Sequence, residues 1–334
     1  MPVLPRQLRR RALIAVAVPA VLLPFTACGA TPPAPDAKAA PAKSAPGFPY
    51  TVTNCGVKTT YQAPPRRAVT LNQHATEVML ALGLQKSMVG TAYLDDTISP
   101  AYEKAYGSVP VLAKEYPSKE KLLAADPDFV YGGYSSAFDA KDGRGRDDLA
   151  GSGIDTRLNL ENCAKGTMDD VYQEVEEVGR TFGVRDRADR WIAQARTTVA
   201  DAATRLKNVK PLSVFVYDSG DKTAFTAGGT GIGNDLITRA GGRNVFADLD
   251  KSFGDATWEQ VVAREPDAIV ILDYGTTTVA QKEKRLLDDS VLQDVPAIKN
   301  KRFAVLPLSN VVLGVRAPDA VAKLAAQLHP GTVK

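Results

Sequence analysis

The sequence predicts an α/β protein of two lobes, each with a mostly parallel central sheet, joined by one long rigid helix. The first observation is a repeat: residues 118–131 read SKEKLLAADPDFVY and residues 257–270 read TWEQVVAREPDAIV. The second is segment 185–208, which contains no Pro or Gly and has apolar residues at helical spacing. Its position between the two copies favours a connecting helix over another packing helix within one domain.

Each copy of the repeat predicts a helix that leads into a strand. Ser118 and Thr257 can cap a helix by accepting a hydrogen bond from a free backbone N–H. Glu120 and Glu259 then fall in the first turn, where the helix dipole favours a carboxylate. A proline ends each helix, and the apolar run beyond it is typical of a strand buried on both faces. Any α/β protein contains such units, but the match at both polar positions favours two equivalent lobes.

The chain begins with a predicted secretion signal over residues 1–27. A basic stretch, RQLRRR, precedes a short apolar run that ends just before Cys28. The junction at Cys28 resembles a bacterial lipoprotein cleavage site, in which this cysteine becomes the lipid-modified N-terminus. Phe25 departs from that motif, where Leu, Val or Ile is usual, so simple secretion with Cys28 removed or free is the alternative.

Composition indicates a soluble globular body behind an extended tether. Hydrophobic residues make up 44% of the 334 and charged residues 24%, both ordinary values. Residues 28–49 are rich in Ala and Pro and predict a tether with no core of its own. Loss of residues 1–27 removes four arginines and no acid, so the net charge of +3 falls to −1. Nothing in this balance indicates a nucleic-acid partner.

Two further cysteines, Cys55 and Cys163, belong to the predicted exported body. Disulfides persist in that environment, so we expect the two to pair and to stabilise the fold by ~3–5 kcal/mol. Two separate buried thiols are the alternative.

The elements of the N-terminal lobe, residues 50–184, follow in order. Residues 51–64 predict a hairpin, residues 68–71 a strand and residues 75–82 a helix ended by Gly83. A second strand over 89–95 and a helix–strand pair that ends in IDTRLNLENC complete the lobe.

The C-terminal lobe, residues 209–330, begins with a predicted strand in PLSVFVYDSG. A Gly-rich loop follows and precedes a helix. Gly229, Gly231 and Gly233 do not match the G-x-G-x-x-G spacing of a dinucleotide site. We interpret these glycines as positions of backbone freedom beside a cleft.

Taken in order, these segments resemble an ABC-importer substrate-binding protein of the group that binds ferric siderophores, cobalamin and haem. The resemblance covers residues 67–328. It depends on LNQHATEVMLALG, on both repeat copies, on the long helix, on AGGRNVF and on LPLSNVVLGVRAPDAVAKLAAQL.

The resemblance implies a ligand held in a cleft between the lobes. It also implies that one glutamate on each lobe, here Glu120 and Glu259, docks onto arginines of a membrane permease that works with a cytoplasmic ATPase. Charge complementarity of this kind sets orientation and association rate. The alternative is that both are ordinary acids of a first helical turn.

Ligands of open α/β sheets bind beyond the carboxyl ends of the strands, and this rule selects the predicted ligand contacts. The selected residues suit a large, flattish, semi-polar ligand, although core or rim packing is an alternative for each tyrosine. They are Asn72, Gln73, His74, Tyr93, Tyr116, Tyr131, Tyr134, Tyr217, Asp218, Phe225, Phe253, Tyr274 and Arg316.

The chain contains two histidines, too few for an importer of free zinc or manganese. For His74 we favour a polar turn residue satisfied by a backbone group over a haem ligand.

We therefore expect a monomeric, non-enzymatic lipoprotein on the outer face of a bacterial cell membrane. It would capture an iron(III)–siderophore complex without a cofactor or a directly bound metal, and deliver it to the permease. Cobalamin or haem is the alternative ligand. An exported hydrolase or a surface receptor without a transport partner is the alternative class, although no G-x-S-x-G, H-E-x-x-H or Ser/His/Asp set supports a hydrolase.

Overall fold

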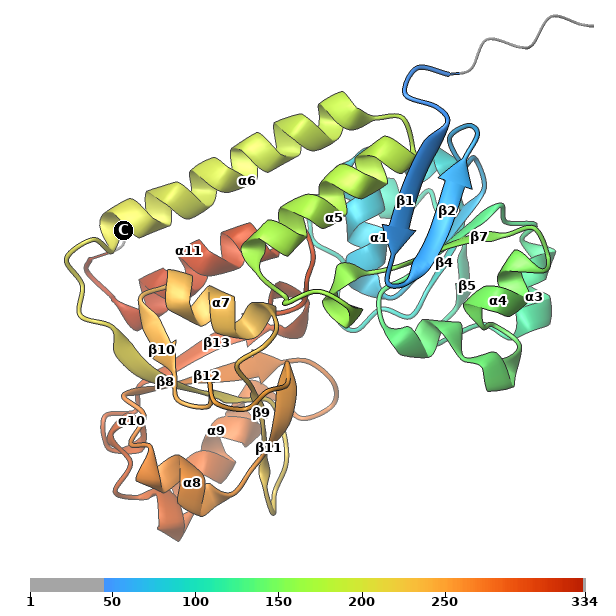
Figure 1. The fold of residues 1–334 in the computed structure, drawn as a ribbon. Helices are drawn as coiled ribbons and strands as arrows, with labels where there is room; N and C mark the ends of the chain where they lie inside the picture. Colours follow the sequence, from blue (N-terminus) through green and yellow to red (C-terminus); the bar gives the residue numbers. More distant parts are fainter. Residues whose placement is uncertain (1–44, 333–334) are drawn as a thin grey trace, which may run out of the picture. The chain divides into compact units, whose positions relative to one another are not determined.

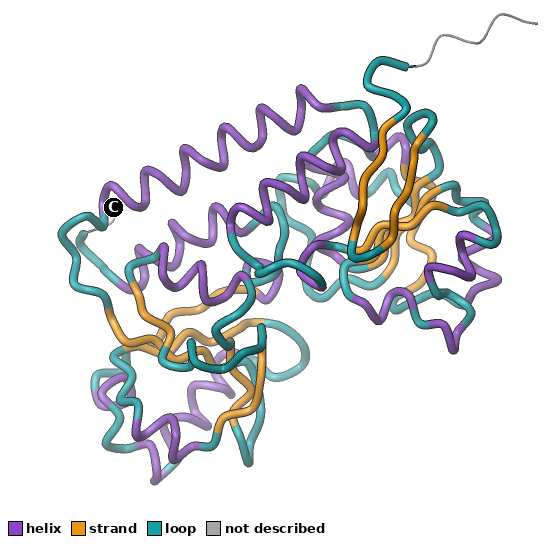
Figure 2. The backbone as a smooth tube through the Cα atoms, in the orientation of Figure 1, coloured by secondary structure: helices purple, strands orange, loops and turns teal. Residues whose placement is uncertain are grey.

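The computed structural model describes residues 45–332, which contain two parallel sheets, one in each lobe (Figures 1 and 2). The N-terminal sheet has the strand order β5-β4-β3-β6-β7, with every neighbouring pair parallel. β3 and β6 are buried along their whole length, as is usual for the central strands of a parallel sheet. The strands are β3 Ala68–Leu71, β4 Met88–Ala92, β5 Val111–Ala113, β6 Phe129–Gly132 and β7 Asp155–Leu158.

The C-terminal sheet has the order β10-β8-β12-β13 and is also entirely parallel. A separate antiparallel pair, β9 with β11, lies beyond the end of β8. These strands are β8 Leu212–Tyr217, β9 Ala224–Ala227, β10 Gly242–Asn244, β11 Phe253–Ala256, β12 Ala268–Asp273 and β13 Phe303–Pro307. The two parallel sheets confirm the predicted α/β class.

The remaining elements connect these strands. The predicted hairpin forms as β1 Tyr50–Asn54 and β2 Val57–Tyr61. The helices are α1 Gln73–Ala81, α2 Glu103–Tyr106, α3 Lys119–Ala124, α4 Arg146–Ala150, α5 Met168–Thr181, α6 Arg185–Arg205, α7 Ile232–Arg239, α8 Trp258–Ala263, α9 Val279–Asp288, α10 Pro296–Lys299 and α11 Ala317–Leu328. Six short 3₁₀ segments are η1 Gln85–Ser87, η2 Ser135–Phe138, η3 Ala140–Asp142, η4 Leu160–Asn162, η5 Ser290–Leu292 and η6 Leu308–Asn310.

The sequence repeat corresponds to a repeated structural unit. α3 leads into β6, which pairs with the first sheet strand β3, and α8 leads into β12, which pairs with the equivalent strand β8. The Pro-Asp aspartates explain why the repeat extends past the helix. Asp128 accepts from the backbone N–H groups of Arg66 and Arg67 at 2.8 and 2.9 Å, and Asp267 accepts from that of Ser213 at 2.8 Å. Each aspartate therefore fixes the start of its lobe's first sheet strand.

Helix α6 packs against both lobes (Figure 1). Its Ala188 belongs to the N-terminal core, whereas Ala195 belongs to the C-terminal core, and Trp191 and Ile192 contact both. A helix of this length extends about 31 Å. Such a helix restricts the relative movement of the lobes more than a loop would.

The predicted disulfide is present between Cys55, in the turn of the β1–β2 hairpin, and Cys163, directly after η4, with a Cα–Cα distance of 5.4 Å. It joins cysteines 108 positions apart in the sequence and connects the hairpin to the segment where the chain leaves the first sheet.

Several boundaries differ from the sequence prediction. α1 begins at Gln73 rather than 75, and Gly83 follows its end with φ +67°. Phe48 is buried in the N-terminal core, so packing begins before the predicted end of the tether at residue 49. The predicted signal and lipidation site, residues 1–28, lie outside the described residues.

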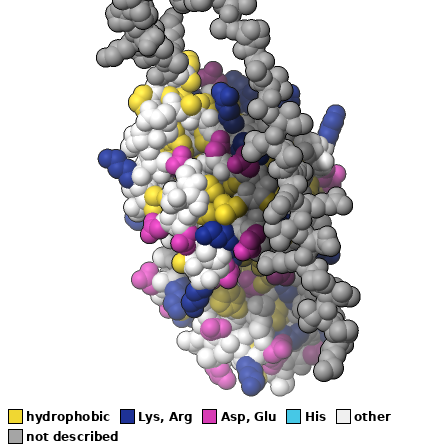
Figure 3. Space-filling model, turned by 90° about the vertical axis from the view of Figure 1, so that its right-hand side faces the viewer, with side chains coloured by type: hydrophobic (Ala, Val, Ile, Leu, Met, Phe, Trp, Pro, Cys, Tyr) yellow, Lys and Arg dark blue, Asp and Glu magenta, His cyan; other side chains and the backbone are white. Residues whose placement is uncertain are grey.

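The described residues have two properties that bear on a membrane span and on a charged surface patch. No helix among them has the length and apolar character needed to cross a membrane. Figure 3 shows acidic and basic side chains interspersed on the visible part of one face, which agrees with the small net charge of the chain.

We predict that replacing both Cys55 and Cys163 by Ser lowers the free energy of unfolding by ~3–5 kcal/mol, because the disulfide restricts a long loop in the unfolded chain. Denaturant titration of the purified protein measures this loss. Adding a reductant to the wild type should reproduce it and should leave the variant unchanged. Equal stability of wild type and variant would contradict the prediction.

Candidate ligand-binding site

A cleft of about 430 Å³ lies between the two lobes at the carboxyl ends of the parallel strands. On the N-terminal side, Tyr134 follows β6 and Glu161 follows β7, whereas Asp218 directly follows β8 on the other side. In both lobes, therefore, lining residues follow the carboxyl ends of strands, as the rule for open α/β sheets predicts. The lining residues are Tyr134, Glu161, Asn162, Asp218, Phe225, Ser252, Phe253, Leu308 and Val312.

The N-terminal lobe contributes one aromatic ring to the cleft lining, Tyr134, and Asn72 links it to the rings of Tyr116 and Tyr93. The Oδ1 atom of Asn72 accepts from the Tyr116 hydroxyl at 3.1 Å and from the Tyr134 backbone N–H at 3.2 Å. Tyr93 stacks on Tyr116 with ring centroids 4.6 Å apart. Asn72 itself is buried, so its side chain positions the rings rather than contacting a ligand.

His74 lies behind Tyr134, with ring centroids 4.8 Å apart, and is only 2% exposed. Neither of its ring nitrogens makes a hydrogen bond of good geometry among the described residues, but the Gly133 main chain acts on the ring and raises its pKa against the effect of burial. Burial lowers the pKa of His74 to about 4, so the ring is neutral at neutral pH. Its close packing depends on Gly133, where a Cβ would lie 2.4 Å from the ring.

Glu161 is the cleft carboxylate of the N-terminal lobe. Its side chain is 12% exposed, and it accepts from the Leu313 backbone N–H at 3.3 Å. Burial raises the pKa of Glu161 to about 7, and burial likewise raises the pKa of the neighbouring Asp95 to about 6. Both groups therefore change charge close to neutral pH.

The C-terminal wall combines a stacked aromatic pair with a second carboxylate. Phe225 and Phe253 belong to the small β9–β11 sheet, with ring centroids 5.7 Å apart. Asp218 accepts a hydrogen bond from the Tyr274 hydroxyl. Lys282 lies behind this pair and donates to the main-chain carbonyls of Asp218 and Leu272, both at 2.6 Å.

Two predicted ligand contacts lie in the core instead. Tyr131 is fully buried, and its hydroxyl donates to Glu174 Oε1 at 2.5 Å. Tyr217 packs between Phe215 and Trp258, and its hydroxyl donates to the Gly220 carbonyl at 3.0 Å. Each tyrosine is near a strand end, as predicted, but its side chain is directed into the core, so neither residue lines the cleft.

Arg316 and Gln73, also predicted ligand contacts, join the lobes. The Arg316 guanidinium donates to both carboxylate oxygens of Glu77, at 2.7 and 2.5 Å, and to the Thr97 carbonyl at 2.6 Å. The Gln73 amide donates to Asp96 Oδ1 at 2.6 Å, and Asp96 in turn accepts from the Ser309 hydroxyl at 2.7 Å. This ionic cluster fastens the closing segment to the N-terminal lobe, and Arg316 is therefore not free to grip a ligand.

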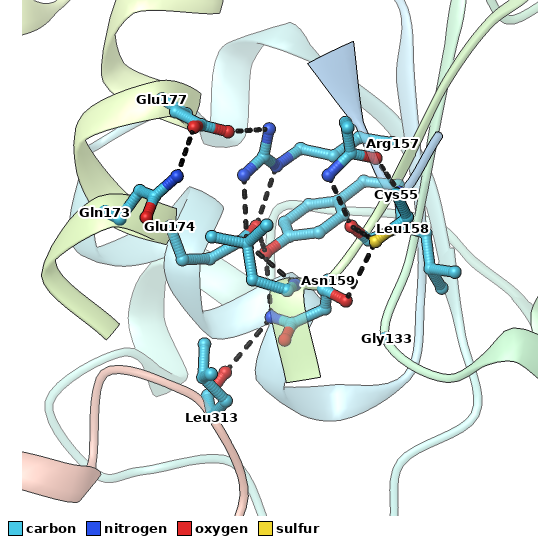
Figure 4. Close-up of polar contacts among 12 residues, drawn as sticks. Cys55, Gly133, Arg157, Leu158, Asn159, Gln173, Glu174, Glu177 and Leu313 are labelled. Atoms are coloured by element: carbon cyan, nitrogen blue, oxygen red, sulfur yellow. Dashed lines mark hydrogen bonds and ion pairs between the residues drawn. The ribbon is translucent and has the colours of Figure 1, made fainter. Parts of the chain in front are cut away.

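A buried polar network supports the cleft from beneath (Figure 4). Arg157, on β7, makes a two-point ion pair with Glu174 on α5, at 2.7 and 2.9 Å, and a third contact with Glu177 at 2.9 Å. Next along the chain, Asn159 donates to the Leu313 carbonyl of the closing segment at 3.0 Å. The network joins the strand end that precedes Glu161 to the opposite lobe.

Some residues that line the cleft were not among the predicted ligand contacts. Glu161 and Asn162 come within a few residues of the end of β7, as Tyr134 does of β6, so the same rule could have selected them. Ser252 and Val312 come from loops, and Leu308 comes from the short 3₁₀ segment η6; none of these positions has a local sequence signal. A larger hollow of about 550 Å³ lies where α5 meets α6, but its lining includes four arginines and none of the predicted residues. We therefore assign the site to the cleft.

Residues 69–309 match the family described as "periplasmic binding protein". The chain is 26% identical over 292 residues to an uncharacterized ABC transporter substrate-binding lipoprotein, YvrC, of Bacillus subtilis, covering 86% of this chain and 88% of YvrC. It is 27% identical over 315 residues to a cobalamin-binding protein of Halobacterium salinarum, covering 91% and 81%.

Two solved structures share the fold. A periplasmic binding protein from Veillonella parvula has 32% identity and a TM-score of 0.78, over 84% of this chain and 97% of the other. An ABC-type Fe³⁺-hydroxamate transport system from Saccharomonospora viridis has 25% identity and a TM-score of 0.71, over 84% and 99%.

We predict that Glu174→Gln destabilises the protein by ~3–5 kcal/mol, because it breaks a buried ion pair and leaves Arg157 only partly compensated. Denaturant titration gives the difference. The control is Glu176→Gln on the same helix, where the side chain is 45% exposed and pairs only with exposed Arg180. That variant should change stability by less than about 1 kcal/mol, and equal losses in the two variants would contradict the prediction.

Proposed function

The chain belongs to the periplasmic binding protein family, and from this premise we propose that it captures a ferric siderophore outside the cell membrane and delivers it to a permease. The family is that of the ABC-transporter binding proteins for siderophores, cobalamin and haem. The chain is therefore a binding protein and not an enzyme. Its partners are a small-molecule ligand, an ABC permease and the associated ATPase.

The observation that supports a chelate ligand is the composition of the cleft. Rings from both lobes, Tyr134 on one side and Phe225 and Phe253 on the other, enclose a space with a few fixed polar groups. Such a site suits a semi-polar organic ligand several rings wide. The relative described as an Fe³⁺-hydroxamate transport system supports iron as the cargo.

Cobalamin is the second candidate, because a cobalamin-binding relative matches over 91% of the chain. Haem is less well supported. His74, the residue proposed from the sequence as a possible haem ligand, is 2% exposed and lies behind Tyr134. Haem also has two carboxylates, which the acidic side chains of this cleft would repel.

We further propose that Glu120 and Glu259 are the docking contacts for the permease. Each lies exposed in the first turn of a short helix on a different lobe, α3 or α8. Their own backbone N–H groups, then the capping hydroxyls of Ser118 and Thr257, lower the pKa of each glutamate. The two carboxylates are thus charged and oriented, as matching contacts on a two-fold permease would need to be.

The proposed location is extracytoplasmic, with Cys28 as the lipid-modified residue and residues 28–49 as the tether of a monomer. The lipoprotein relative YvrC supports this proposal.

We predict saturable binding of a ferric siderophore by the purified protein in isothermal titration calorimetry, with its metal-free form binding at least about tenfold more weakly. The panel also contains cyanocobalamin and hemin. Selective binding of either would overturn the siderophore proposal while leaving the transport role. Binding of none would contradict both.

We predict that the double reversal Glu120→Lys/Glu259→Lys abolishes uptake into cells and leaves the dissociation constant of the ligand unchanged, because docking and binding use separate surfaces. Glu103→Lys is the control, since Glu103 is also an exposed first-turn acid, on α2. Uptake that survives the double reversal would refute the docking assignment.

A further inference from the structure

The charged side chains that line the cleft are all acidic. Its lining includes two carboxylates, Glu161 from the N-terminal lobe and Asp218 from the C-terminal lobe, and no lysine or arginine is among the lining residues. Acidic groups thus face the ligand space from both sides.

Neither carboxylate has an ion pair with Lys or Arg among the described residues. The basic neighbour of Glu161 is His74, whose Nε2 lies 3.9 Å away and whose burial keeps the ring neutral. Asp218 accepts a hydrogen bond from the Tyr274 hydroxyl, and Lys282 interacts with it electrostatically, but the hydrogen bonds of Lys282 are made to two main-chain carbonyls and not to the carboxylate. Asp218 is only 4% exposed.

This arrangement contrasts with the buried acid beneath the cleft. Glu174 is compensated by a two-point contact with Arg157. A shielded carboxylate without such a partner destabilises the empty protein, because its charge is removed from water without compensation. A cation between Glu161 and Asp218 would supply the missing partner. The faces of Tyr134, Phe225 and Phe253 would attract the same cation through their π electrons.

We propose that this cleft selects a ferric chelate in which the iron and its ligating groups have no net charge and a separate pendant group is cationic. The cationic group lies between Glu161 and Asp218. This inference rests on the proposed function. Iron(III) is neutralised by three singly charged hydroxamates. Three doubly charged catecholates leave the complex strongly anionic, and carboxylate chelators also add negative charge. The ligand class is therefore a hydroxamate siderophore with a protonated amine.

The test uses three iron(III) complexes that share one coordination sphere and differ in charge. Desferrioxamine B is a linear trihydroxamate with a terminal ammonium group. Acetylation of that amine gives a neutral complex, and succinylation gives a complex with one negative charge. Calorimetry on the purified protein should rank them cationic, neutral, anionic, with roughly tenfold weaker binding at the first step.

Two variants connect the ranking to the named residues. Glu161→Gln/Asp218→Asn should bring the affinities for the cationic and acetylated complexes to within about twofold of each other. Glu176→Gln, which removes a carboxylate on α5 away from the cleft lining, should preserve the wild-type ratio. Circular dichroism checks that each variant is folded.

A pH titration provides an independent readout. The groups that face Glu161 are His74 on α1, Tyr134 before η2 and Asp95 after β4. Glu161 has a pKa raised to about 7 and therefore loses its charge as the pH falls through that value, and Asp95 follows at about 6. The preference for the cationic complex should shrink from about pH 8 to about pH 6, while the ligand ammonium stays protonated.

The outcomes separate this inference from the proposed function. Equal affinities for the three complexes, or tighter binding of the anionic one, would overturn the charge inference and leave siderophore capture intact. Binding of none of them, with binding of cyanocobalamin or hemin, would overturn both. A ranking retained in Glu161→Gln/Asp218→Asn would show that charge selection arises elsewhere and would refute the assignment to these residues.

Discussion

The buried ion pair between Arg157 and Glu174 is the interaction on which the ligand site depends most. It joins β7 to α5 inside the N-terminal lobe, and the same carboxylate accepts from the Tyr131 hydroxyl and from the Leu160 backbone N–H. Leu160 directly precedes Glu161, so the pair fixes where the chain enters the cleft. A buried ion pair adds little net free energy of folding, because desolvation of the two charges offsets much of their attraction. Its main effect is to fix the positions of the groups that it joins.

Contacts between the lobes extend this rigidity across the molecule. Arg316 pairs with Glu77, and Asp96 accepts from Ser309, so the closing segment before α11 is fastened to the N-terminal lobe beside the cleft. Helix α6 packs into both cores at its two ends. We therefore expect ligand capture to depend on a preformed cleft and small side-chain movements rather than on a wide hinge.

Local chemistry made much of the fold predictable. The capped helices, the Pro-Asp strand starts and the hairpin each have a sequence signal within a few residues, and export made the Cys55–Cys163 disulfide predictable. The site was less predictable because strand ends locate a cleft without giving the direction of a side chain. Tyr131 is therefore a core residue, although the neighbouring Tyr134 lines the cleft. The ion pair of Arg316 was not predictable because its partner Glu77 is 239 residues away in the sequence.

We propose that one iron chelate occupies the cleft between the lobes. Anomalous diffraction at the iron absorption edge, from crystals grown with the iron(III) complex of desferrioxamine B, tests it most directly. We expect one strong iron peak between Tyr134 on one side and Phe225 and Phe253 on the other, with the ligand ammonium beside Glu161 and Asp218. An iron peak in the arginine-lined hollow between α5 and α6, or iron absent from the cleft, would contradict it.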